Sequence, residues 1–95
     1  MVEIMLEKKI ESAVKQYARD KGWLAYKFTS TAHIGVPDGI FISPTGRVIF
    51  MEFKQTGKLP TPMQQREIDR LNQHGVYALV VDSVEQGKGV IDAYS

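Results

Sequence analysis

The sequence has 95 residues, enough for one domain, and it contains no cysteine. The missing cysteines exclude a disulfide scaffold, thiolate metal sites and cysteine catalysis, and they fit a reducing compartment such as the cytoplasm. The net charge is only +1, no apolar run approaches the length of a membrane span, and the charged residues within positions 1–9 do not fit a signal peptide. We expect residues 1–95 to form a single globular domain without a membrane anchor.

Residues 3–20 have the spacing of an amphipathic helix, with apolar side chains every three or four positions. The apolar stripe consists of Leu6, Ile10, Val14 and Tyr17. A lysine and a glycine at 21–22 are typical of a helix C-terminus. Residues 23–28 are rich in aromatic residues and predict a strand, whose Trp23 and Tyr26 we assign to the core.

Two further strands are predicted at 38–43 and 47–54, joined by the turn Pro44-Thr45-Gly46. A second helix begins after the N-cap Thr61, with Pro62 at its first position, and ends at His74-Gly75. The apolar positions of this helix are Met63, Ile68 and Leu71.

Residues 76–81 form a continuous apolar run, which is typical of a buried strand. The segment from Ser83 to Gln86 has the pattern of a capping box and predicts a last helix. The core face of that helix would consist of Val84, Gly87, Val90, Ile91 and Tyr94. The predicted order, α-β-β-β-α-β with a C-terminal helix, indicates an α/β fold in which helices flank a mixed sheet.

The turn at 44–46 sets the pairing of the two central strands if Ser43 faces Arg47 across it. The ladder then places Asp38 opposite Glu52, with their β-carbons about 5 Å apart. Two opposed carboxylates repel each other unless a cation lies between them, and Mg²⁺ suits such a pair because it binds one or two carboxylates together with phosphate oxygens. Lys54 emerges on the same face as Glu52, where an ammonium group can stabilise charge on a phosphate.

A Glu-x-Lys tripeptide alone is common on a solvated strand face, so the preceding Gly35-Val36-Pro37-Asp38-Gly39 adds weight to the interpretation as a site. This segment, followed after about a dozen residues by Glu52-Phe53-Lys54, resembles the motif of the PD-(D/E)XK nuclease superfamily. In its finer pattern the chain resembles the VRR-NUC family, in the short stand-alone form of phages and bacteria. The similarity covers most of the chain, from the first helix to the second, and implies a restriction-endonuclease-like core.

The resemblance also implies roles for particular residues. In such families the aspartate and the glutamate bind Mg²⁺ or Mn²⁺ and the lysine assists the attacking water, so these roles fall on Asp38, Glu52 and Lys54. The main-chain carbonyl of Phe53 would be a further metal ligand. An acidic residue in the first helix would complete the metal site, and Glu11 fits that position.

Two of these assignments have alternatives. Glu7, one turn earlier, is a rival to Glu11, and either residue could be a charged flank of the apolar stripe. Related families also carry a glutamine at the start of the helix after Glu-x-Lys, which here is Gln64, with Gln65 as the substitute. Gln64 would contact the metal's water or a phosphate in catalysis, or else it would close a capping box with Thr61.

Polar and basic residues around the loop before Asp38 are candidate contacts to a sugar–phosphate backbone. They are Lys27, Thr29, Ser30, Thr31 and His33, with Lys58, Arg66 and Arg70 as an extension of this rim. An ordinary polar loop is the alternative, and His33 would then be a solvated side chain rather than a general base.

Together the residues and the resemblance predict a Mg²⁺- or Mn²⁺-dependent endonuclease that hydrolyses DNA, encoded by a phage or a bacterium. One active site nicks one strand, so cutting both strands or a Holliday junction requires a symmetric pair of sites, and we expect a homodimer. The alternatives are a non-catalytic nucleic-acid-binding module with a nuclease fold, and a nuclease subunit that acts on flaps or on RNA.

Overall fold

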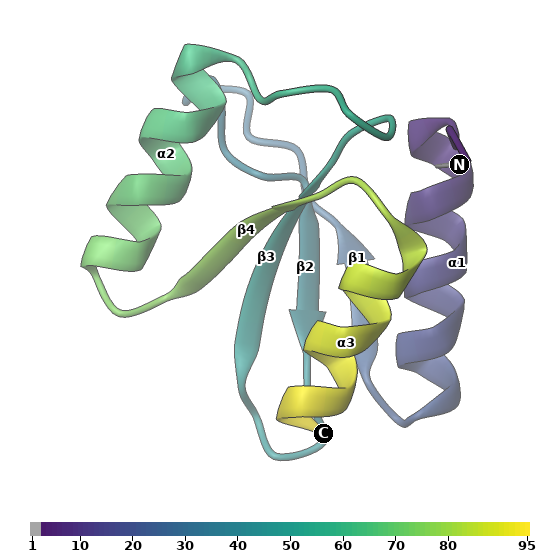
Figure 1. Cartoon of the computed structure of the whole chain (residues 1–95). Coiled ribbons are helices and arrows are strands. Elements are labelled where there is room, and N and C mark those ends of the chain that lie inside the picture. The colour runs from purple at the N-terminus through teal and green to yellow at the C-terminus, as the bar shows by residue number, and fades with distance from the viewer. Residues whose placement is uncertain (1–2) are drawn as a thin grey trace.

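The computed structural model describes residues 3–95, which form three helices and one four-stranded sheet (Figure 1). The elements in chain order are α1 (Glu7–Asp20), β1 (Leu24–Lys27), β2 (Gly39–Ile42), β3 (Val48–Phe53), α2 (Pro62–Gln73), β4 (Tyr77–Val81) and α3 (Val84–Tyr94). The predicted order of helices and strands is therefore confirmed. Among residues 3–95, no helix is long and apolar enough to cross a membrane.

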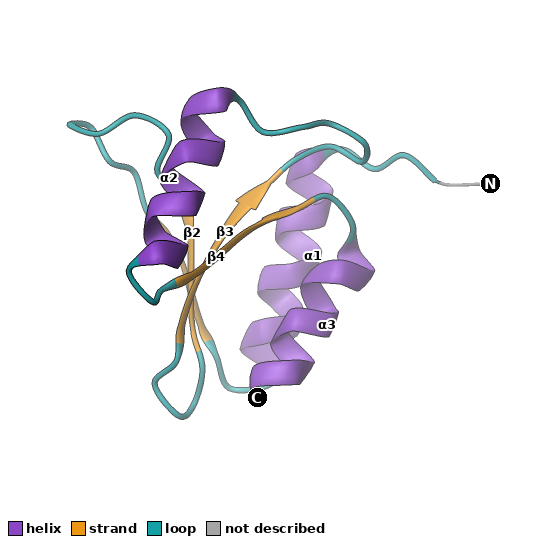
Figure 2. Cartoon of the chain, turned by 60° about the vertical axis from the view of Figure 1, so that its left-hand side comes forward, coloured by secondary structure: helices purple, strands orange, loops and turns teal. Residues whose placement is uncertain are grey.

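The sheet is mixed, as predicted, with strand order β1-β2-β3-β4. The pairs β1–β2 and β2–β3 are antiparallel, whereas β3 and β4 are parallel. Figure 2 shows α1 and α3 side by side on one face of the sheet and α2 on the other. The parallel pairing follows from α2, because a strand–helix–strand connection returns the chain in the same direction.

The main core lies between the sheet and the α1–α3 pair. It contains Ile10, Val14 and Ala18 of α1, Trp23, Ala25, Phe41, Ile49, Met51, Phe53 and Val81 around the sheet, and Ile91 of α3. Gly87 brings the two helices close together, because a β-carbon at this position would collide with the side chain of Val14. The predicted placement of Trp23 in the core is thus confirmed, and the glycine that weakens α3 locally has a packing role.

Three expectations about local structure were wrong. Leu6 does not belong to the apolar stripe, because it is the extended N-cap of α1 and its side chain is exposed. Tyr26 is not in the core: it is 54% exposed, on edge strand β1 and on the sheet face opposite to the α1–α3 core. Ser83 and Gln86 do not form a reciprocal capping box, since Ser83 Oγ accepts from the Gln86 N–H but Gln86 Oε1 accepts from the N–H of Asp82.

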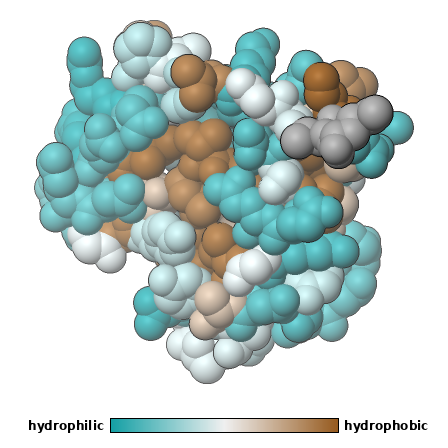
Figure 3. Space-filling model, viewed as in Figure 1, coloured by the Kyte–Doolittle hydropathy of each residue, from teal (hydrophilic) through white to brown (hydrophobic). Residues whose placement is uncertain are grey.

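The outer edge of β4 is closed by two side-chain amides. Asn72 donates to the carbonyl of Ala78 at 3.0 Å and accepts from its N–H at 2.8 Å, and Gln86 donates to the carbonyl of Val80 at 2.8 Å. Apolar residues gather over β4, between α2 and α3, on the face seen in Figure 3. An apolar edge strand with unpaired main-chain groups can pair with a strand of another chain, so the two amides protect β4 from such pairing.

Candidate active site

The hairpin of β2 and β3 positions the two carboxylates that the sequence pointed to. Gly39 pairs with Met51 and Ile42 with Val48, and the Ser43 N–H donates to the Arg47 carbonyl at 2.9 Å. This is the register that the turn at 44–46 predicted. Continuing the ladder by one residue pair places Asp38, just before β2, opposite Glu52 of β3.

Strand alternation separates the site from the core. Met51 and Phe53 are fully buried beneath α1 and α3, so Glu52 and Lys54 point to the other face of the sheet. Both charged residues are only 9% exposed. The Lys54 N–H donates to the Val81 carbonyl at 2.9 Å, which fixes the main chain directly after β3. The end of β3 therefore holds an acid and a lysine on one face in a largely desolvated position.

The electrostatics of Glu52 show that its charge is poorly compensated. Burial raises the pKa of the Glu52 carboxyl to about 7, and the negative charge of Asp38 adds to the rise, while Lys54 opposes it. Within residues 3–95, none of the ion pairs closer than 4 Å involves these three side chains. A carboxylate in this condition favours a proton or a cation beside it.

The start of α1 lies at the same end of the sheet (Figure 1). The Met5 N–H donates to Thr56 Oγ1 at 3.1 Å, and the Thr56 N–H donates to the Met5 carbonyl at 3.2 Å, which ties α1 to the loop after β3. The charges of Glu7 and Glu11 also raise the pKa of Glu52, so both carboxylates lie within electrostatic range of it. The Glu11 carboxylate is paired with Lys15 at 2.6 Å.

A divalent cation fits this donor set in part. Asp38 and Glu52 supply two carboxylates on one face, and a cation between them would offset the burial that raises the pKa of Glu52 and the repulsion that adds to the rise. Across the part of the chain that the structure describes, however, no three His, Cys, Asp or Glu side chains are gathered into a metal-binding group. The ion pair of Glu11 with Lys15 uses Oε2 of the carboxylate.

Gln64 lies in the first turn of α2 and forms the capping box that was one of its two interpretations. Its Oε1 accepts from the Thr61 N–H at 2.9 Å, and Thr61 Oγ1 accepts from the Gln64 N–H at 3.2 Å. Only its amide NH₂ is left for a phosphate or a water. The substitute candidate, Gln65, donates to Asp69 at 2.9 Å on the exposed side of α2.

The segment between β1 and β2 is anchored to α2 by a buried acid that the sequence analysis missed. The Nε2 of His33 lies 2.7 Å from Oε1 of Glu67, which also accepts from Arg70 at 3.3 Å. His33 is therefore held against α2, although 51% of its side chain remains exposed. The signal was present in the sequence, because Glu67 interrupts the helical apolar series between Met63 and Leu71.

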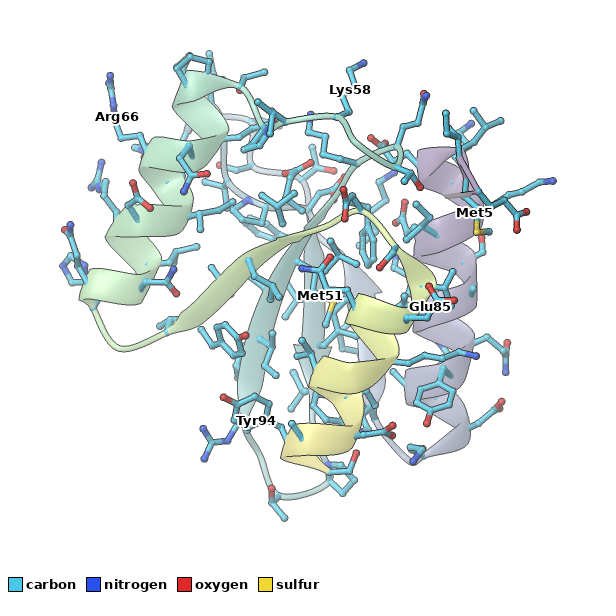
Figure 4. The ribbon with its side chains drawn as sticks, in the orientation of Figure 1. Met5, Met51, Lys58, Arg66, Glu85 and Tyr94 are labelled. Carbon is cyan, nitrogen blue, oxygen red and sulfur yellow. The ribbon has the colours of Figure 1, made fainter. Side chains whose placement is uncertain are left out.

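The remaining predicted nucleic-acid contacts come from separate segments of the chain. Lys27 is exposed at the end of edge strand β1, Thr31 is exposed in the segment before Asp38, and Ser30 Oγ accepts from the His33 N–H at 3.2 Å. Lys58 is exposed in the loop between β3 and α2 and extends outward there (Figure 4). Lys27, Thr31 and Lys58 are thus free to contact a phosphate backbone, whereas Ser30 shapes its own segment.

Comparison with known proteins places this chain among nucleases. It is 40% identical over 82 residues to "Putative nuclease p44" of Acyrthosiphon pisum secondary endosymbiont phage 1, which covers 86% of this chain and 88% of that protein. A solved structure described as "VRR_NUC domain" matches with a TM-score of 0.86 at 30% identity and covers 94% of this chain and 97% of its own.

A second solved structure, "VRR_NUC domain protein", matches with a TM-score of 0.74 over 97% of this chain and 89% of its own. At 21% identity this likeness shows the fold alone. No family model matches the sequence.

Proposed function

This chain belongs to the VRR-NUC family of nucleases, and from that premise we propose that it hydrolyses phosphodiester bonds of DNA at Asp38, Glu52 and Lys54. The observation that carries the proposal is the pairing of Asp38 with Glu52 beside Lys54, on a sheet face separate from the core. Burying an acid such as Glu52 without an ion-pair partner lowers the stability of a small fold, so its presence favours a role in catalysis.

The proposed cofactor is Mg²⁺ or Mn²⁺, held by Asp38 and Glu52, with the Phe53 carbonyl and Glu11 as the further ligands. When bound, the ion would supply Lewis-acid stabilisation of the charge that develops on the phosphate oxygens. The β2–β3 ladder begins one residue after Asp38 and sets the main chains of Asp38 and Glu52 opposite each other, so we expect the site to be assembled before substrate arrives.

Lys54 would act on the phosphate directly. Its ammonium group lies two residues after Glu52 on the same face and is largely shielded from water, which strengthens its attraction to a phosphate oxygen. In this position it stabilises the added negative charge of the transition state and orients the attacking water. The NH₂ group of Gln64 is the candidate for a second contact to that phosphate, since its Oε1 is used in the capping box.

We further propose that the active form is a homodimer that acts on branched DNA. One hairpin site reaches one strand, so paired cuts need a second copy related by two-fold symmetry. Sedimentation velocity at micromolar protein tests the oligomeric state. A dimer supports this part of the proposal, and a monomer that nicks only one strand contradicts it without affecting the chemistry.

The test of the proposed function is cleavage of labelled plasmid, four-way junction, flap and RNA substrates with Mg²⁺, Mn²⁺ or EDTA. Asp38→Ala is expected to remove cleavage and to keep the fold, because Asp38 lies outside the β2–β3 ladder and Gly39 begins it. Glu85→Ala is a matched control, since Glu85 is an exposed acid at the start of α3 (Figure 4). Full activity of purified Asp38→Ala protein would rule out this site. Cleavage of RNA alone would mean that the substrate is RNA and not DNA.

A further inference from the structure

An open pocket of about 300 Å³ lies between the segment that leads to Asp38 and one side of α2. Its apolar lining includes Ile34 from the segment and Met63 from α2, which are 71% and 46% exposed. Single exposed apolar residues are ordinary on a protein surface. Ile34 and Met63, however, face one pocket from different elements and together form an exposed apolar lining.

Three charged or polar side chains of the pocket lining contact one another, with Glu67 at the centre. Glu67 is buried and contacts His33 and Arg70 through the same oxygen, Oε1. Arg66 also lines the pocket, and it forms no ion pair with a residue in the range 3–95. Figure 4 shows Arg66 extending from α2 into solvent. The pocket therefore combines an apolar lining with a free cation at its rim.

This combination matches the chemistry of a nucleotide. A base presents flat apolar faces that pack on side chains such as Ile34 and Met63, and its phosphate is attracted to a cation such as Arg66. Oε2 of Glu67 is not used in a hydrogen bond to a described residue and can accept from an exocyclic amino group. The pocket volume lies at the lower end of the range for small-ligand sites, which suits a single nucleotide.

The pocket is also close to the proposed reaction centre. Ile34 precedes Asp38 by four residues, so their α-carbons are at most about 14 Å apart. Successive nucleotides of one strand rise by about 3.4 Å in a duplex, so this distance spans only a few nucleotides. A strand whose phosphate lies at Asp38 and Glu52 can therefore place a nearby base in the pocket.

We propose that this pocket binds an unpaired nucleotide of the substrate strand close to the bond that is cut. The inference rests on the proposed nuclease function and adds a substrate feature to it. A base inside a duplex must leave its stack to enter such a pocket, and this costs least where the base is already unpaired. DNA with an unpaired nucleotide is therefore the favoured ligand.

The test measures binding without cleavage, by fluorescence anisotropy of labelled DNA in EDTA. Two duplexes are compared that differ only in one unpaired nucleotide. Wild-type protein is expected to bind the second duplex about fivefold or more tightly, because removing the apolar face of one base from water against Ile34 and Met63 corresponds to about that factor. The double variant Ile34→Ala/Met63→Ala is expected to lose this preference and to keep its affinity for the paired duplex.

Leu59→Ala is the matched control, because Leu59 is 82% exposed and does not line the pocket. This variant is expected to keep the preference of the wild type. The proposal is overturned if the wild type binds neither duplex or binds both equally, if the double variant keeps the preference, or if it loses affinity for both duplexes alike. Cleavage in Mg²⁺ by wild type and by Asp38→Ala reports separately on the proposed function, so the two failures are distinguishable.

Discussion

Replacing Glu52 by glutamine is expected to remove cleavage and at the same time to stabilise the metal-free protein. The pKa of Glu52 is about 7 in the folded chain, against its ordinary value of 4.5, so the folded state binds this proton more tightly than the unfolded state does. The stability of the wild type therefore falls as pH rises from about 4.5 to about 7, by about 3 kcal/mol in total. Glu52→Gln has no ionisable group at this position and escapes the loss.

Urea denaturation in EDTA at a series of pH values measures this effect. Near pH 4 the free energies of unfolding of wild type and Glu52→Gln are expected to agree, and near pH 8 the variant is expected to be more stable by about 3 kcal/mol. Glu3→Gln is the matched control, because Glu3 is exposed and the same charge change there should leave the pH profile unchanged. A difference between Glu52→Gln and wild type that did not vary with pH, or a wild type more stable near pH 8, would refute the reasoning.

Three further predictions concern the framework around the site. Gly35→Ala should destabilise the fold by about 1–3 kcal/mol and lower cleavage. Gly35 has a φ of 93°, and a β-carbon there would lie 2.6 Å from a main-chain oxygen of α2. An unchanged melting temperature would contradict this prediction. Gly87→Ala should destabilise by about 1–3 kcal/mol through overpacking against buried Val14, whereas Gly89→Ala, in open space on the same helix, should stabilise by about 0.5–1 kcal/mol. Denaturant titration measures both, and effects of the same sign would be inconsistent with the helix packing. Asn72→Ala should lower the free energy of unfolding by about 1–3 kcal/mol and promote aggregation, because the N–H and carbonyl of Ala78 at the edge of β4 lose their partner. Unchanged stability and unchanged light scattering would argue against this role of Asn72.

The sequence predicted best where local rules decide the structure. The turn at 44–46 and the two-residue period of the strands set the register of β2 and β3, and with it the positions of Asp38 and Glu52. The same period placed Met51 and Phe53 in the core and Glu52 on the other face. These features depend on residues close together in the chain, so no knowledge of the tertiary packing was needed.

The sequence predicted least well where burial depends on distant elements. Tyr26 has the character of a core residue, but its strand is at the edge of the sheet, and its face lies opposite to the α1–α3 core. The sequence placed Gly87 on the core face of the last helix, but the close approach of Val14 appears only in the folded chain. The contact of His33 with Glu67 joins residues 34 positions apart, and neither residue type by itself indicates the other.

The most direct test of the active site at Asp38 and Glu52 is anomalous scattering from a crystal soaked in Mn²⁺. We expect a manganese peak within coordination distance of the carboxylates of Asp38 and Glu52, with the ammonium group of Lys54 beside it. A map with no ion at that place, or a structure in which the two carboxylates diverge onto opposite faces of the sheet, would contradict the assignment of the active site.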